Sequence, residues 1–198
     1  MKNIVILISG GGSNMQAILR ASELREWKSR FNAEITCVIS NIADAKGLNT
    51  AKDFGVATQI VEHTKFKSFD NPRLEFEKEL ITVIDHHQPV LVVLAGFMRI
   101  LTPHFVDHYA NKLINIHPSL LPAFTGLHTH ARAIEMGCQF AGATVHRVTS
   151  ELDHGPILEQ AVVPVLSGDT EEVLAARVLT QEHIIYPRAI ENLLAQMG

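Results

Sequence analysis

The sequence of 198 residues predicts an α/β fold, with an open, mainly parallel twisted sheet, helices on both faces and an antiparallel C-terminal portion. The first observation is that short apolar runs alternate with helical patterns over the first 120 residues. This alternation is typical of parallel strands joined by right-handed helical crossovers. The second observation is a pair of strand-like segments flanking a polar, turn-rich loop near residue 150. Together these features predict a Rossmann-like architecture.

The expected elements follow the chain in order. A glycine-rich turn at 9–14 separates the first strand from a helix, and a short helix is expected over 43–54. Asn71-Pro72 resembles a helix start, and apolar residues recur every fourth position after it for about four turns. The parallel strands are expected at 4–8, 35–39, 57–61, 90–95 and 113–116. The later elements are an antiparallel pair at 144–148 and 157–165 and a closing helix that begins within 169–172.

Composition excludes several classes of protein. The chain is 46% hydrophobic and 19% charged, so it can bury a substantial core, and we find no repeat or linker that would divide the single domain expected over 1–198. A net charge of -4 leaves no basic excess for broad nucleic-acid binding. The two cysteines are far apart, which favours a reducing cytoplasm, and the first apolar run is too short for a signal peptide or a membrane span.

The glycine-rich turn is a candidate anion site. Residues 10–14 follow a strand and open a helix, where free backbone N–H groups attract phosphate. Met15 replaces the third glycine of a dinucleotide fingerprint, and no Gly-Lys-Ser/Thr follows, which argues against nicotinamide cofactors and ATP. A tight turn without a ligand remains the alternative.

Three polar residues are candidates for acyl-transfer chemistry. Asn115 and His117 end an interior strand and point the same way, so an amide donor and an imidazole would share one side of the ligand crevice. Such a pair could stabilise an oxyanion and move a proton. Asp153, in the polar loop before Gly155-Pro156, could hold the imidazole as imidazolium. The alternatives are a capping asparagine, a packed histidine and a solvated turn aspartate.

Two further patterns concern ligands. The apolar segment 94–101 carries one arginine and could form a pocket for a flat heterocycle, with ordinary core as the alternative. The chain has eleven histidines, but His128-Thr129-His130 with His117 and His146 fits no standard zinc spacing, so we expect no metal.

Taken together, these segments resemble the folate-dependent formyltransferases of the glycinamide ribonucleotide transformylase type, and the match runs in order through nearly the whole chain. Each segment alone is suggestive, and their common order is specific. They are Ile8 to Asn14, Leu94 to Leu101, Asn115 to Pro122, Gly126 to His130, Glu151 to Pro156 and Thr180 to His183.

The resemblance implies a role for each matched residue. Asn115, His117 and Asp153 would be the catalytic trio of a metal-free transfer from 10-formyltetrahydrofolate, the co-substrate, to the amine of glycinamide ribonucleotide. The binding residues would be Gly12, Ser13 and Asn14 for the phosphate, Glu182 for the ribose, Met98, Arg99, Ile100, Leu101 and Asn115 for the folate, and Arg73 for its glutamate tail. The 1–100 half would bind the ribonucleotide, and the 101–198 half would hold catalysis and the folate. Some members of the family are dimers, and the sequence leaves a homodimer open.

The chain departs from the family pattern at two places. Ala123-Phe124-Thr125 stands where Lys-Tyr-Pro is frequent, and Gly11 replaces a small polar residue. A formyltetrahydrofolate deformylase, which would use water instead of the amine, is the main alternative. Methionyl-tRNA formyltransferases would need a further tRNA-binding domain. A nucleotide-binding regulator without catalysis would use the glycine turn alone.

Overall fold

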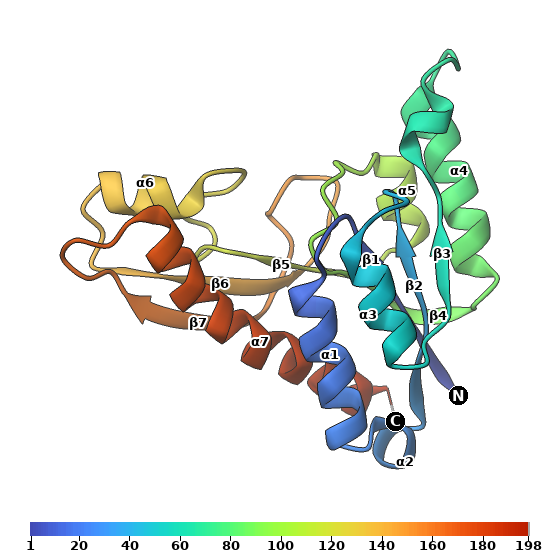
Figure 1. Ribbon diagram of the computed structural model, residues 1–198, viewed down its shortest axis with the longest axis horizontal. Helices are drawn as coiled ribbons and strands as arrows, with labels where there is room; N and C mark the ends of the chain where they lie inside the picture. Colours follow the sequence, from blue (N-terminus) through green and yellow to red (C-terminus); the bar gives the residue numbers. More distant parts are fainter. Residues whose placement is uncertain (198) are drawn as a thin grey trace.

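The computed structural model describes residues 1–197 and shows a single seven-stranded sheet with the order β3-β2-β1-β4-β5-β6-β7 (Figure 1). The first five strands of this order are parallel, and β6 and β7 run antiparallel to their neighbours. The predicted fold class is therefore confirmed. The strands are β1 (Lys2–Ile8), β2 (Ala33–Ser40), β3 (Thr58–Ile60), β4 (Pro89–Leu94), β5 (Leu113–His117), β6 (Phe140–Arg147) and β7 (Ile157–Pro164).

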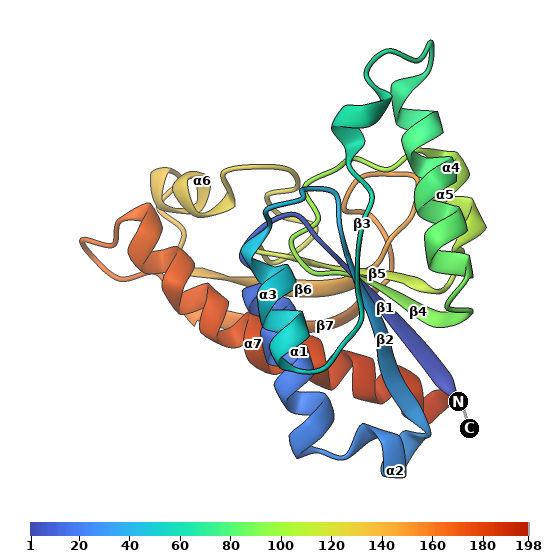
Figure 2. The ribbon, with the colours of Figure 1, turned by 45° about the vertical axis from the view of Figure 1, so that its right-hand side comes forward.

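The helices cover both faces of the sheet (Figure 2). Strand β1 explains why, because Ile4, Ile6 and Ile8 belong to one buried cluster with α1 and α7, while Val5 and Leu7 belong to a second cluster with α4 and α5. Alternate side chains of a strand point to opposite faces, so a continuous apolar run needs cover on both. The helices are α1 (Ser13–Leu24), α2 (Trp27–Phe31), α3 (Lys46–Asp53), α4 (Pro72–Asp85), α5 (Pro103–His108), α6 (Thr129–Glu135), α7 (Glu171–Gln196) and the 3₁₀ turn η1 (His63–Phe66).

Several boundaries differ from the sequence prediction. The short elements α2, η1, α5 and α6 were not anticipated, since helices of four to seven residues show less than two full turns of periodicity. Helix α3 begins at Lys46, later than expected. Strand β6 begins at Phe140 because its pairing with β7 extends through small residues such as Gly142, which carry little strand signal.

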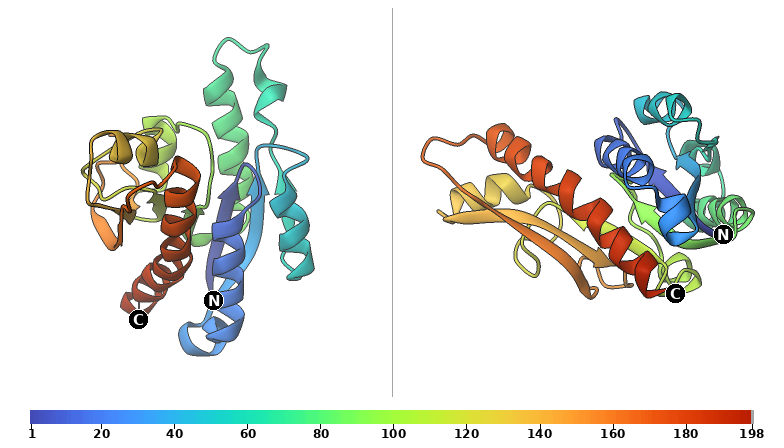
Figure 3. Two further views of the ribbon diagram at one scale, coloured as in Figure 1. Left: turned by 60° about the vertical axis from the view of Figure 1, so that its left-hand side comes forward. Right: turned by 90° about the horizontal axis from the view of Figure 1, so that it is seen from below.

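Helix α7 runs along β6 and β7 and reaches α1, as both views in Figure 3 show. Its Tyr186 is fully buried, and the hydroxyl lies 2.8 Å from the carbonyl oxygen of Leu94 and 3.2 Å from that of Ile114. Burial raises the pKa of Tyr186 well above its usual value, so the hydroxyl keeps its proton and donates it. One side chain thus connects α7 to the ends of β4 and β5, next to Asn115.

Even α7, the longest helix within residues 1–197, falls short of the sustained apolarity that a membrane-crossing segment needs, as does every shorter helix there.

Replacing Tyr186 by phenylalanine should lower the free energy of unfolding by about 1 kcal/mol, because two buried carbonyls lose their shared donor while the ring is kept. Urea unfolding measures the change. An Ile184→Ala control, on the exposed side of the same helix, should change stability by less than about 0.5 kcal/mol. Equal stability of Tyr186→Phe and the wild type would contradict a structural role for this hydroxyl.

Candidate active site

The candidate site lies where the strand order reverses. Strand β1 pairs with β2 on one side and β4 on the other, so the strand order reverses at β1, and ligands of open α/β sheets bind at the carboxyl ends of the strands beside such a reversal. A cleft of about 430 Å³ opens there. Its lining combines the segment after β4 with polar residues of β5 and β6 and with the loop that joins β6 to β7. The cleft is therefore assembled from distant parts of the chain.

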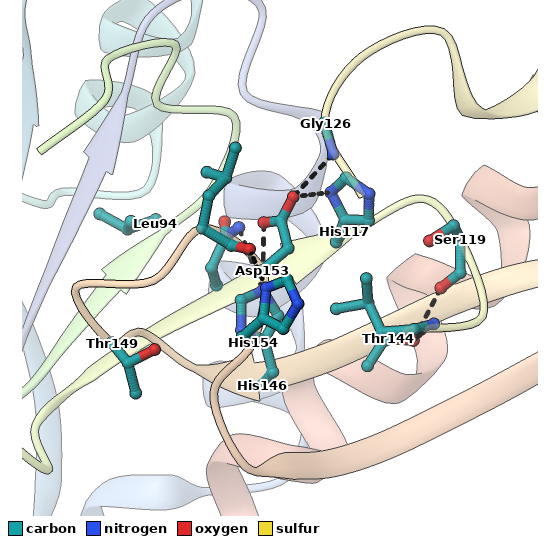
Figure 4. A network of polar contacts seen from close by, with 12 residues as sticks. Leu94, His117, Ser119, Gly126, Thr144, His146, Thr149, Asp153 and His154 are labelled. Carbon is teal, nitrogen blue, oxygen red and sulfur yellow. Dashed lines mark hydrogen bonds and ion pairs between the residues drawn. The ribbon is translucent and has the colours of Figure 1, made fainter. Parts of the chain in front are cut away.

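His117 and Asp153 face each other in this cleft (Figure 4). The distance from His117 Nδ1 to Asp153 Oδ2 is 3.5 Å, and the two side chains are 9% and 7% exposed. Asp153 reaches this position because the β6–β7 loop folds back on β6. A Cβ atom on Gly155 would lie 1.7 Å from the carbonyl oxygen of Arg147, so only glycine allows this approach. The residues that the sequence placed on separate segments thus lie together.

The backbone of residues 124–126 completes the surroundings of this pair. His117 Nε2 lies 2.9 Å from the carbonyl oxygen of Phe124, and the backbone N–H of Gly126 donates to Asp153 Oδ2 over 2.9 Å. Both nitrogens of the His117 ring therefore face oxygen acceptors. The Nε2 contact requires a hydrogen on that nitrogen, because the carbonyl oxygen of Phe124 can only accept.

His146 was considered only as a metal ligand in the sequence, yet it belongs to this site. It is 2% exposed on β6 and pairs directly with Asn115 across the strands. Burial lowers its pKa, which keeps the ring neutral. His146 Nδ1 donates to the carbonyl oxygen of Arg147 over 2.9 Å, so Nε2 can accept from the amide of Asn115 at 3.4 Å. The pairing register of β5 with β6, which the sequence did not reveal, is the signal that identifies His146.

The contact with His146 orients the amide of Asn115. A carboxamide nitrogen carries two hydrogens, and His146 accepts one of them, which leaves the second available at the edge of the cleft that Asn115 lines. Asp153 Oδ1 lies 3.9 Å from His146 Nε2, so His146 also borders the carboxylate. Asn115, His117 and Asp153 are thereby brought to one location.

The glycine turn after β1 forms the N-terminus of α1. Gly12 adopts φ +71, a left-handed conformation that favours glycine, at a helix end whose first N–H groups have no partner within the helix. Ser9 fastens the turn, because its hydroxyl donates to Asn41 over 2.6 Å and accepts from the backbone N–H of Met98 over 2.8 Å. The candidate anion site and the apolar segment after β4 are therefore held to each other.

Glu182 of α7 lies beside this turn, far from it in sequence. Asn14 Nδ2 donates to Glu182 Oε2 over 2.6 Å, and the amide oxygen Oδ1 of Asn14 is buried without a partner among the described residues. Burial raises the pKa of Glu182, and the hydrogen bond from Asn14 offsets part of that effect. This pair joins the two halves expected for the domain, since Asn14 comes from the first and Glu182 from the second.

The segment Met98 to Leu101 lines the apolar part of the cleft. Met98 and Ile100 are 71% and 64% exposed, which is unusual for large apolar side chains and leaves them available to a ligand. The residues from Leu94 to Ile100 that line the cleft come from the expected 1–100 half and the other lining residues come from 101–198, so both halves contribute to the cleft. Arg73 is exposed in the first turn of α4 and does not line the cleft. Its expected role has no support from the shape of the cleft.

Within the part of the chain that the structure describes, no three histidine, cysteine or acidic side chains are grouped as a metal ion would require.

Replacing Glu182 by glutamine should make stability less dependent on pH. In the unfolded chain the carboxyl ionises near its ordinary pKa, about 4.3. The folded protein has a raised pKa here and holds the proton longer, so wild-type stability falls as pH rises from the ordinary pKa to the raised one. Glutamine removes this fall and can still accept from Asn14.

Urea unfolding of both proteins over a range of pH measures the difference, with Glu135→Gln at an exposed position as the control. The free energy of unfolding of Glu182→Gln, taken relative to the wild type, should increase with pH. A constant difference would show that burial does not perturb this carboxyl.

Comparison with known proteins identifies the family of the chain. The profile of the formyl transferase family matches residues 2–190. The chain is 53% identical over 188 residues to phosphoribosylglycinamide formyltransferase of Escherichia coli, covering 95% of this chain and 85% of that protein. It is 42% identical to the human trifunctional purine biosynthetic protein adenosine-3, over 95% of this chain and 18% of that longer protein.

Solved structures agree with the sequence comparison. The crystal structure of phosphoribosylglycinamide formyltransferase from Brucella melitensis superimposes with a TM-score of 0.89 at 47% identity, over 98% of this chain and 96% of that one. The matched region includes the glycine turn, the cleft and the His117–Asp153 pair. With this fold, this site and these relatives, the chain belongs to the formyl transferase family.

Proposed function

We propose that this protein transfers the formyl group of 10-formyltetrahydrofolate to the amine of glycinamide ribonucleotide, giving formylglycinamide ribonucleotide and tetrahydrofolate in de novo purine biosynthesis. The observation that carries the proposal is the buried His117–Asp153 pair in an apolar cleft, next to the helix N-terminus at Gly12. Membership of the family implies a folate-derived formyl donor. The names of the relatives favour transfer over the hydrolysis of a deformylase.

The reaction begins when the amine nitrogen attacks the formyl carbon. The carbon becomes tetrahedral and its oxygen gains negative charge, which Asn115 and protonated His117 stabilise. The bond from this carbon to N10 of the folate then breaks, and the proton that the amine loses ends on N10. Asp153 sustains the imidazolium and relays this proton through water, for which its contact with His117 over 3.5 Å is suited.

The ribonucleotide binds along the start of α1. Its phosphate accepts hydrogen bonds from the free N–H groups of Gly12, Ser13 and Asn14, where the dipole of the helix also favours negative charge. Glu182, held by Asn14, accepts hydrogen bonds from the ribose hydroxyls. This arrangement directs the amine end of the substrate toward the cleft.

The folate occupies the cleft itself. Met98, Ile100 and Leu101 pack on the pterin ring, while the backbone of this segment, including Arg99, and the amide of Asn115 meet its polar edge. Arg73 as a contact for the glutamate tail rests on the family resemblance alone. Both substrates are small molecules. We place the reaction in the cytoplasm.

A spectrophotometric assay with 10-formyltetrahydrofolate, with and without glycinamide ribonucleotide, tests this function. Because the amine is the attacking group, we expect turnover only when the ribonucleotide is present. Equal turnover without it would select the deformylase. Binding without turnover under either condition would select a nucleotide-binding regulator.

A His117→Ala variant tests the assigned role of His117 in the same assay. Loss of one oxyanion donor should reduce turnover by about two to three orders of magnitude. The variant should keep its affinity for the ribonucleotide, whose binding residues lie on α1 and α7. Near-normal turnover would reject the assigned role of His117.

A further inference from the structure

The backbone of the loop between β5 and α6 contacts both members of the His117–Asp153 pair. The carbonyl oxygen of Phe124 accepts from His117 Nε2, and the N–H of Gly126 donates to Asp153 Oδ2, each over 2.9 Å. Gly126 lines the cleft, whereas Phe124 packs against the buried core. The Phe124 contact therefore anchors the His117 ring on the side away from the cleft. It leaves Nδ1 facing Asp153.

The conformation of this loop needs support from outside. Phe124 has φ 56 and His128 has φ 57, both in the left-handed region that large side chains seldom adopt. Such a conformation persists only where the surrounding structure holds it. In this loop it directs the carbonyl of Phe124 at His117. If the support were lost, Phe124 would relax and its carbonyl would turn away from the ring.

Arg132 of α6 provides that support. Its guanidinium lies over the ring of Phe124, 5.2 Å from the ring centre. Nη1 of the same group donates to the carbonyl oxygen of Thr125 over 2.7 Å and approaches that of Leu127 at 3.4 Å. The planar, multiply donating guanidinium suits this combination of stacking and backbone contact. Among the described residues Arg132 forms no ion pair, so the loop is its main partner.

We propose that Arg132 is a positioning residue, which holds the loop at Phe124 to Gly126 and through it orients His117 toward Asp153. The contacts of Arg132 with this loop give it the role, because one guanidinium both stacks on the ring of Phe124 and donates to the neighbouring carbonyl oxygen of Thr125. The kinetic consequence rests on the proposed formyl transfer, whereas the effect on the His117 ring does not.

Replacing Arg132 by alanine should change the His117 ring and the turnover together. In ligand-free protein labelled with ¹⁵N-histidine, NMR should show a protonated, hydrogen-bonded Nε2 for wild-type His117. In Arg132→Ala this signal should broaden or disappear through exchange with water. We expect kcat to fall about tenfold, the effect of about 1.4 kcal/mol on a barrier, with KM for both substrates within about twofold.

Arg30→Ala is the matched control. Arg30 lies on α2, which contributes no residue to the site, and it also stacks on a phenylalanine, Phe31, at 4.8 Å and donates to a backbone carbonyl oxygen. It should leave both the His117 signal and kcat unchanged. Arg132→Lys keeps the charge without the planar group and should restore only part of kcat. Arg132→Gln, which can still donate to Thr125, replaces the alanine variant if that variant fails to fold.

An unchanged His117 signal in Arg132→Ala would overturn the inference, whatever happened to kcat. So would a changed signal with normal kcat, since His117 would then be displaced without consequence. A wild-type protein that turns over no substrate would instead remove the proposed function, and the NMR comparison would still decide whether Arg132 positions His117. The His117 signal is assigned from its absence in a His117→Asn variant.

Discussion

The contact between His117 and Asp153 is the interaction on which the site depends. Each side chain is less than 10% exposed, and a buried carboxylate without a partner would be costly. The pair therefore fixes the β6–β7 loop against β5 and against the backbone of Gly126. Because the imidazole faces a carbonyl on one side and a carboxylate on the other, the same contacts that satisfy buried polar groups also orient the His117 ring at the cleft. Structure and proposed chemistry share these bonds.

The sheet gives this pair its two neighbours. Reversal of strand order between β1 and β4 places the N-terminus of α1 and the apolar segment after β4 at the same edge. Ser9 joins them through hydrogen bonds to Asn41 and Met98, so the glycine turn and this apolar segment keep a fixed relation. From the other side, α7 contributes Glu182 to the turn and Tyr186 to the strand ends. A transfer reaction requires such a fixed arrangement of binding regions, because its two substrates must meet with little freedom of position and orientation.

Much of this arrangement could be predicted from the sequence, for local reasons. Continuous apolar runs marked the parallel strands, and the glycine turn marked the start of α1. The resemblance to a family added the approach of Asp153 to His117, which no local pattern contains. His146 was missed as a site residue because its role depends on strand register, and Arg132 because its partner is a loop backbone. Contacts made by pairing and by main-chain atoms leave little trace in residue types.

If His117 and Asp153 act as one unit, a double-mutant cycle on kcat/KM shows it most directly. The variants are His117→Ala, Asp153→Ala and the pair together. Residues that act through each other have strongly non-additive effects on kcat/KM. The double variant should therefore be about as active as the less active of the two single variants. If the two losses instead multiplied in the double variant, each residue would act independently, and a shared role for the pair would be contradicted.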